Sequence, residues 1–161
     1  MDTPEYALVQ TKNVESFYRQ YAGKCSNAGL ALILSLLAEA AARQFNALKT
    51  MPKARASLPH SNLLREAHGI FSRMQVGSRR FDVDPRQAEY CREAQQFERE
   101  ILRFYQDQEQ AAATDGEKEY FHALAKEAKQ HIFLLDHIIE FVSRPDTWVA
   151  HAEFNHLLDE D

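Results

Sequence analysis

Glutamate and histidine, the residue types found at Glu98 and His131, are side chains that bind metal ions in helical bundles. Helical bundles that hold two metal ions use six such side chains: two helices supply one Glu each, and the other two supply a Glu-x-x-His each. Residues three apart lie on one face of a helix, so one carboxylate can bridge the ions while the imidazole caps one of them. Here the residue three positions before His131 is Ala128. The pattern therefore indicates metal chemistry with an incomplete set of ligands.

The remaining histidines and the two cysteines carry weaker signals. Cys25 and Cys91 are far apart in the sequence and form no CxxC motif, which argues against a zinc ribbon and a disulfide framework. We expect both thiols to be inert in a reducing cytoplasm. The other histidines form no HxxxH or HExxH pattern, and we interpret them as surface or packing residues: His60, His68, His122, His137, His151 and His156.

The composition is typical of a soluble all-α protein. Hydrophobic residues make up 45% of the 161 residues, and Gly and Pro are scarce at five each. The net charge is −5 with no basic stripe, so we expect no nucleic-acid partner. The first residues lack the features of a signal peptide, and the most apolar run, Cys25 to Ala38, is shorter than the roughly 18 residues of a membrane span. We therefore expect a cytoplasmic protein with no membrane partner.

Hydrophobic periodicity and stop signals predict where the helices lie. Ser26 and Asn27 suit the start of one helix, and Asp84 followed by Pro85 suits the start of another. Residues 52–84 are too long for a simple turn, so we predict a crossover that contains one short helix. The predicted helices cover about residues 5–22, 28–50, 61–74, 84–113 and 117–142.

The order of these helices predicts one domain, residues 1–161, built from two helical hairpins. Hairpin 1 covers about residues 5–50, hairpin 2 about 85–143, and the crossover 52–84 joins them. The tail, residues 144–161, contains Trp148 and further apolar residues, which predicts that it docks on the helices.

An internal repeat relates the two hairpins. A constant shift of 87 residues places Phe17-Tyr18 on Phe104-Tyr105. The same shift places Gly29 on Gly116, at the two hairpin turns. Any two amphipathic helices share some Leu and Ala, but an aromatic pair and a turn glycine on one shift indicate a duplicated hairpin.

Two motifs of hairpin 2 lead to a known family. They are Glu98-Arg-Glu-Ile-Leu-Arg-Phe-Tyr105 and Leu124-Ala-Lys-Glu-Ala-Lys-Gln-His131, followed by an ending from Phe141 to His156. With these motifs the chain resembles the rubrerythrin branch of the ferritin-like proteins over residues 5–161. The resemblance implies an antiparallel four-helix bundle with one long crossover. Members with intact sites resemble non-haem iron oxidases and peroxide reductases.

The resemblance implies six ligand positions, of which two are retained. Glu98 and His131 match a glutamate and a histidine of the family. One carboxylate and one imidazole do not hold two irons, because hard or borderline divalent ions need several anionic oxygens or imidazoles. We expect no cofactor, with iron or manganese as the alternative, and the sequence assigns no catalytic residue. The four positions that lack the family's ligand are Thr11, Ala41, Gln44 and Ala128.

The remaining polar residues allow three interpretations. A buried hydrogen-bond network of Glu98 and His131, with Thr11 and Gln44 as neutral partners, could replace the metal site. Alternatively Glu15, one turn from Thr11, could join Glu98 and His131 in a weak mononuclear site. A vacated cavity that binds an unidentified small molecule is the third interpretation.

Two neighbouring acids are not expected to restore the site. Glu39 precedes Ala41 by two residues and Glu127 precedes Ala128 by one. On a helix of 3.6 residues per turn these offsets rotate their side chains by about 200° and 100°.

The second helix is apolar nearly all round from Leu30 to Ala38. A helix of this kind is buried on all sides, whereas a four-helix bundle buries one face of each helix. The crossover or a second subunit could cover the other face, and we expect a homodimer through this helix. The function that follows is a non-catalytic or altered-function binding or scaffold dimer. The alternative is a rubrerythrin-type iron or manganese oxidoreductase that acts on peroxide or iron.

Overall fold

The fold is all-α in the computed structural model, which describes residues 4–50, 62–77 and 86–143. These residues form five helices and no strand. The predicted docking of the tail 144–161 falls outside the described residues, as does most of the connection between the hairpins on either side of its helix. The helices are α1 (Pro4–Lys24), α2 (Ala28–Thr50), α3 (Leu63–Gly77), α4 (Arg86–Ala111) and α5 (Asp115–Ser143).

Local sequence signals set the helix ends. The side chain of Asn27 accepts a hydrogen bond from the backbone N–H of Leu30 at 3.0 Å, so Asn27 caps α2 as predicted. The hydroxyl of Thr114 accepts from the backbone N–H of Glu117 at 3.1 Å and caps α5. Because Thr114 is the cap, α5 begins at Asp115 and not at Glu117 as the pattern predicted.

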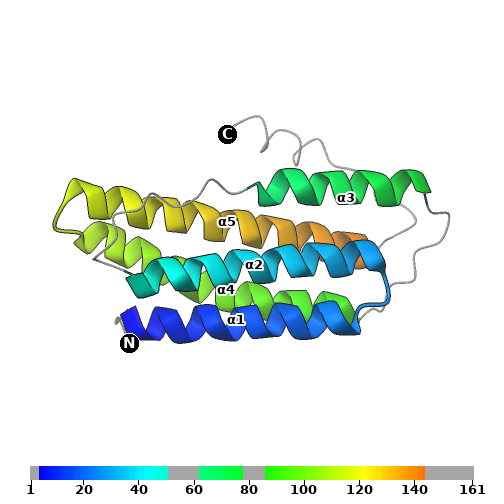
Figure 1. Ribbon diagram of the computed structural model, residues 1–161, viewed down its shortest axis with the longest axis horizontal. Coiled ribbons are helices and arrows are strands. Elements are labelled where there is room, and N and C mark those ends of the chain that lie inside the picture. Colours follow the sequence, from blue (N-terminus) through cyan, green and yellow to red (C-terminus); the bar gives the residue numbers. More distant parts are fainter. Residues whose placement is uncertain (1–3, 51–61, 78–85, 144–161) are drawn as a thin grey trace.

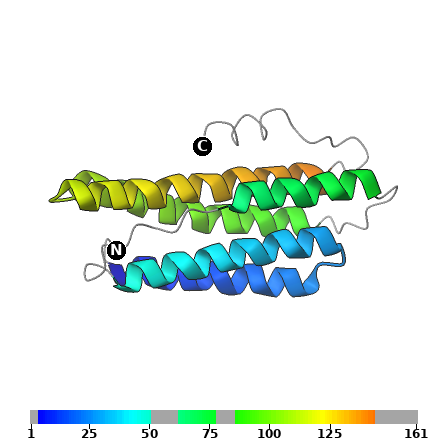
Figure 2. The same ribbon diagram turned by 45° about the horizontal axis from the view of Figure 1, so that its top comes forward.

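Consecutive helices pack as pairs. The most extensive contacts join α1 with α2 and α4 with α5, and α1 also packs against α4 (Figure 1). Figure 2 shows the same two pairs after rotation, with α3 lying along α2 and α5. The shared interior lies between the pairs, so side chains from α1, α2, α4 and α5 can meet there.

The crossover helix α3 covers one side of α2. Its buried face packs on α2 and α5, and the ring of Phe71 lies 6.1 Å from that of Phe141. This packing accounts for part of the apolar surface of α2, because the crossover supplies the cover that a single face of the bundle does not. Leu32 of α2 remains 56% exposed. The buried apolar residues of α3 are Leu63, Leu64, Ala67, Ile70 and Phe71.

By length and composition, α2 is the helix in the described part of the chain that could cross a membrane. Its most apolar 18-residue window has a mean hydropathy of 1.4, and 44% of that window is buried inside the protein. A core helix meets the same criterion, and α2 packs against α1, α3 and α5.

Candidate functional site

Four polar side chains from three helices meet in the interior. Tyr18 of α1 donates a hydrogen bond to Oε1 of Glu98 on α4 at 2.8 Å. Nδ1 of His131 on α5 lies 3.2 Å from the same oxygen. On the other side of the ring, Nε2 of His131 lies 3.6 Å from Oε1 of Glu127, one turn earlier on α5. We call Tyr18, Glu98, Glu127 and His131 the buried acid–imidazole cluster.

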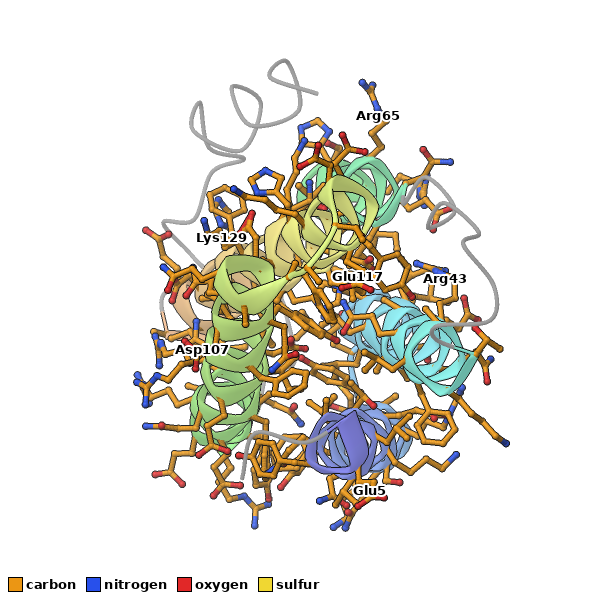
Figure 3. The ribbon with its side chains drawn as sticks, turned by 90° about the vertical axis from the view of Figure 1, so that its left-hand side faces the viewer. Glu5, Arg43, Arg65, Asp107, Glu117 and Lys129 are labelled. Carbon is orange, nitrogen blue, oxygen red and sulfur yellow. The ribbon has the colours of Figure 1, made fainter. Side chains whose placement is uncertain are left out.

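The helices bring this cluster into the core because its members occupy the apolar stripes of their helices. On α4 the buried positions recur as Ala94, Glu98 and Ile101, and on α5 as Leu124, Ala128 and His131. Charged groups placed on such a stripe lose their water, which costs several kcal/mol unless they are paired and hydrogen-bonded. The charged side chains labelled in the end-on view of Figure 3 are instead exposed: Glu5, Arg43, Arg65, Asp107, Glu117 and Lys129.

The cluster holds His131 as an imidazolium. Burial alone would lower the pKa of His131, but the negative charge of Glu98, followed by the close contacts of the ring with the carboxylates of Glu127 and Glu98, raises this pKa to about 10. Both ring nitrogens therefore carry protons and point at carboxylate oxygens. Burial, followed by the charge of Glu98, raises the pKa of Tyr18 well above its ordinary value, so the phenol remains a donor.

A second buried hydrogen bond, between two neutral side chains, lies at the positions that the 87-residue shift relates to Tyr18 and His131. The hydroxyl of Tyr105 donates to Oε1 of Gln44 at 3.1 Å, and both side chains are buried. Tyr105 and Tyr18 are related by the 87-residue shift, and so are His131 and Gln44. The hydroxyl of Thr11 is bonded to its own helix, at 2.9 Å from the carbonyl oxygen of Ala7.

The structure places all six ligand positions implied by the resemblance in the interior. The two alanines are fully buried among apolar side chains. These positions are Thr11, Ala41, Gln44, Glu98, Ala128 and His131, each at most 2% exposed.

The two substitute acids considered from the sequence take different places. The carboxylate of Glu15 is held on its own helix, at 2.9 Å from Nε of Arg19 and 3.4 Å from Nζ of Lys12. Burial would raise the pKa of Glu15, but hydrogen bonds from these two cations lower it. Glu127, which was not expected to restore the metal site, has its carboxylate buried beside His131 in spite of the rotation of about 100° from Ala128. The four-residue spacing from Glu127 to His131 was the signal that could have revealed this.

The residues present do not fit a di-iron centre. In the described parts of the chain, no group of three or more His, Cys, Asp or Glu side chains is arranged to hold a metal ion. The hydroxyl of Thr11 and the amide of Gln44 are engaged in hydrogen bonds and carry no charge. Several buried atoms of the cluster have no hydrogen-bond partner within the protein: Oε2 of Glu98, Oε1 of Glu127 and Nε2 of His131.

An aromatic recess between α1 and α4 adjoins the cluster at Tyr18. The rings of Tyr21 and Tyr90 stack in it with centroids 3.8 Å apart, and Phe17 meets Tyr21 edge-on at 4.3 Å. The recess leaves no interior space for a water molecule, so it does not favour the interpretation of a small-molecule carrier. Its wall consists of Phe17, Tyr18, Tyr21, Leu34, Gln87, Tyr90, Cys91, Ala94 and Leu135.

Comparison of the chain with models of protein families, with curated proteins and with solved structures gives no match. The function is therefore inferred from the geometry of the described residues.

Proposed function

We propose that this chain is a rubrerythrin-like, ferritin-type four-helix bundle in which the buried acid–imidazole cluster takes the place of the di-iron centre. It acts as a non-catalytic binding or scaffold protein, as a homodimer in the cytoplasm without a nucleic-acid or membrane partner. The observation that carries the proposal is the position of His131, whose two ring nitrogens each face a carboxylate.

The arrangement of the helices supports the bundle. α1 with α2 and α4 with α5 form the two most closely packed pairs, and α3 lies in the connection between them. Residues related by the 87-residue shift are buried alike, for example Ala41 with Ala128 and Tyr18 with Tyr105. A duplicated hairpin accounts for this agreement, because equivalent faces of the two pairs then turn toward one interior.

Charge balance supports the loss of metal. A six-ligand site with four carboxylates is stable when two cations neutralise it. This chain buries two carboxylates around one imidazolium and has neutral residues at the other ligand positions. The proton on His131 therefore performs part of the neutralising role, and a metal ion would have to displace that proton to bind the ring.

Metal content tests the proposal. Untagged protein produced with iron and manganese supplied is expected to contain far less than one ion per chain. The control is the variant that restores the family's ligands, Thr11→Glu, Ala41→Glu, Gln44→His and Ala128→Glu, with its helix content checked by circular dichroism. Near-stoichiometric metal in the natural protein, lost on His131→Ala, would overturn the proposal. A folded control variant that fails to bind iron would show that the positions were mapped incorrectly.

One observation favours an oxidoreductase as the second candidate. Glu127 adds a third potential ligand beside Glu98 and His131, and each has a buried polar atom without a hydrogen-bond partner. A single iron or manganese ion on these three side chains would need them to rearrange, because the described residues present no group of three that is arranged to hold a metal ion. Glu127→Gln separates the candidates, because it would abolish metal binding in a mononuclear site and would leave the metal content of a metal-free protein unchanged.

The homodimer is proposed through α2. The support is Leu32, which is 56% exposed on a helix whose first eleven residues carry no charge. α3 covers another side of α2, so the surface left for a second subunit is narrower than the sequence alone predicted.

A further inference from the structure

Two tyrosine rings from different hairpins stack face to face where α1 packs against α4. The ring centroids of Tyr21 and Tyr90 lie 3.8 Å apart, and the two ring planes differ by 25°. Ring carbons at this separation are in van der Waals contact. Both side chains are half-buried, so a reagent in solvent can reach them. The contact is therefore an accessible, preformed pair of phenols.

Neighbouring side chains hold the two rings in this arrangement. Phe17 meets Tyr21 edge-on, with centroids 4.3 Å apart, and Phe97 packs against Phe17 at 5.9 Å. The recess lined by Phe17, Tyr21 and Tyr90 has no interior space for a water molecule. Side chains packed at this density have few alternative rotamers, so the rings stay face to face.

The face-to-face geometry is the one in which two phenoxyl radicals couple. A tyrosine that loses one electron and its hydroxyl proton keeps an unpaired electron, shared between the oxygen and carbons of the ring. This electron occupies orbitals perpendicular to the ring plane. Two such rings therefore form a carbon–carbon bond through their faces, whereas an edge-on contact lacks the overlap.

The other four tyrosines have different surroundings among the described residues. Tyr18 and Tyr105 are fully buried, and their hydroxyls are hydrogen-bonded inside the core. Tyr120 contacts Phe121 edge-on, with ring planes at 84°. The hydroxyl of Tyr6 bonds a carboxylate of α4 at 3.4 Å. The stacked pair is thus the ring contact between two tyrosines in the part of the chain that the structure describes.

We infer that Tyr21 and Tyr90 form a dityrosine cross-link between the two hairpins when the protein meets a one-electron oxidant. Each phenol gives one electron to the oxidant and its hydroxyl proton to solvent. The two radicals join through the ring carbon next to each C–O carbon, in one new C–C bond. Each bonded carbon then loses its hydrogen as a proton and each oxygen regains one, which restores both aromatic rings. In total two electrons and two protons leave, and two equivalents of oxidant are reduced.

This modification site goes beyond the proposed function and is independent of it, because it depends on the contact of α1 with α4 and not on the metal content of the interior. Burial, followed by the charge of Glu93, raises the pKa of Tyr21. The hydroxyl of Tyr21 therefore keeps its proton at neutral pH, and oxidation releases the proton together with the electron.

The experiment uses the full-length natural protein, illuminated briefly with a ruthenium(II) tris-bipyridyl photosensitiser and persulfate. The reaction is quenched with dithiothreitol, and the product is separated on a denaturing gel and mapped by proteolysis and mass spectrometry. The expected product is a link from Tyr21 to Tyr90 within one chain, with the fluorescence of dityrosine and a mass lower by two hydrogens. The link closes a long loop, so the cross-linked protein is expected to melt on the order of 10 °C higher than the unmodified protein.

Two conservative variants test the assignment. Tyr21→Phe and Tyr90→Phe each keep a stacked ring but remove one phenol, so each is expected to abolish the link. The matched control is Tyr120→Phe, which removes another half-buried phenol and is expected to leave the yield unchanged. Dityrosine that persists within one chain in Tyr21→Phe and in Tyr90→Phe would overturn the inference. So would a natural protein whose tyrosines are oxidised without a link, or with links only between two chains, and this readout needs no variant.

Discussion

The protonated state of His131 makes stability fall as pH rises above neutrality. An unfolded chain binds this proton with a pKa near 6.5, whereas the folded protein binds it with a pKa of about 10. The folded state therefore holds more protons between these values, and its stabilisation, complete below pH 6.5, is lost as pH rises toward 10. Each unit of pKa difference corresponds to about 1.4 kcal/mol, so the full contribution is on the order of 5 kcal/mol.

The assay is urea unfolding followed by circular dichroism, between pH 6.5 and 8.5. The upper limit lies below the ordinary pKa of 9.0 for cysteine, because the pKa values of Cys25 and Cys91 are both raised by burial and would add a slope of the same sign above pH 9.0. Over this window the free energy of unfolding is expected to fall by about 2 kcal/mol. Tris and phosphate buffers of matched ionic strength separate this effect from screening of surface charges.

Two variants identify the group responsible. His131→Gln removes the proton, so its free energy of unfolding is expected to be nearly flat over the window. At pH 6.5 the same variant is expected to be about 3–5 kcal/mol less stable, because two buried carboxylates lose their cation. The matched control is His122→Gln, whose imidazole is 70% exposed, and it is expected to keep the natural slope. A flat profile in the natural protein, or an unchanged slope in His131→Gln, would refute the ion cluster.

Three further predictions follow from named contacts. Tyr18→Phe removes a hydrogen-bond donor to a carboxylate, and we expect it to lower the free energy of urea unfolding by about 2–3 kcal/mol. Tyr105→Phe removes a donor to a neutral amide, and we expect a loss of about 1–2 kcal/mol. Equal losses would contradict a charged acceptor at Tyr18. Leu32→Glu is expected to convert a dimer to a monomer in sedimentation velocity. The control is Val9→Glu, at a similarly exposed position on α1, which is expected to leave the dimer intact. A monomeric natural protein would refute the proposed homodimer. Phe71→Ala is expected to cost about 3–5 kcal/mol, because its ring packs between α3 and α5; a loss below about 1 kcal/mol would show that α3 does not contribute to the core.

Much of the fold was predictable because it depends on local signals. Periodicity located all five helices to within three residues, and Asn27 marked the start of α2. The position of a helix can be read from the spacing of the apolar residues on its buried face and from the residues that cap its ends. The partner of the apolar α2 was not predictable, because the choice between the crossover and a second subunit depends on where α3 packs.

The candidate site was predictable by position but not by side-chain direction. Glu98 and His131 were identified, and both lie in the interior within hydrogen-bond distance. Glu127 was missed because the rotation of its Cα–Cβ bond was treated as the direction of its carboxylate. A glutamate has three rotatable bonds, and attraction to a cation one turn away draws its carboxylate under the helix.

The two hairpins differ in the buried charge that they carry. Under the 87-residue shift, Glu98 corresponds to Thr11, Glu127 to Ala40 and His131 to Gln44, so every charged member of the cluster lies on the second hairpin. If single charged side chains were distributed over both hairpins, each would lie in the low-dielectric interior far from a side chain of opposite charge. Burying an unpaired charge destabilises the folded state. Grouping two carboxylates around one imidazolium satisfies the charges locally, and Tyr18 is the contribution of the first hairpin. The buried charges of this interior are therefore paired by two short-range arrangements: Glu127 lies one turn from His131 on α5, and Glu98 faces His131 from α4.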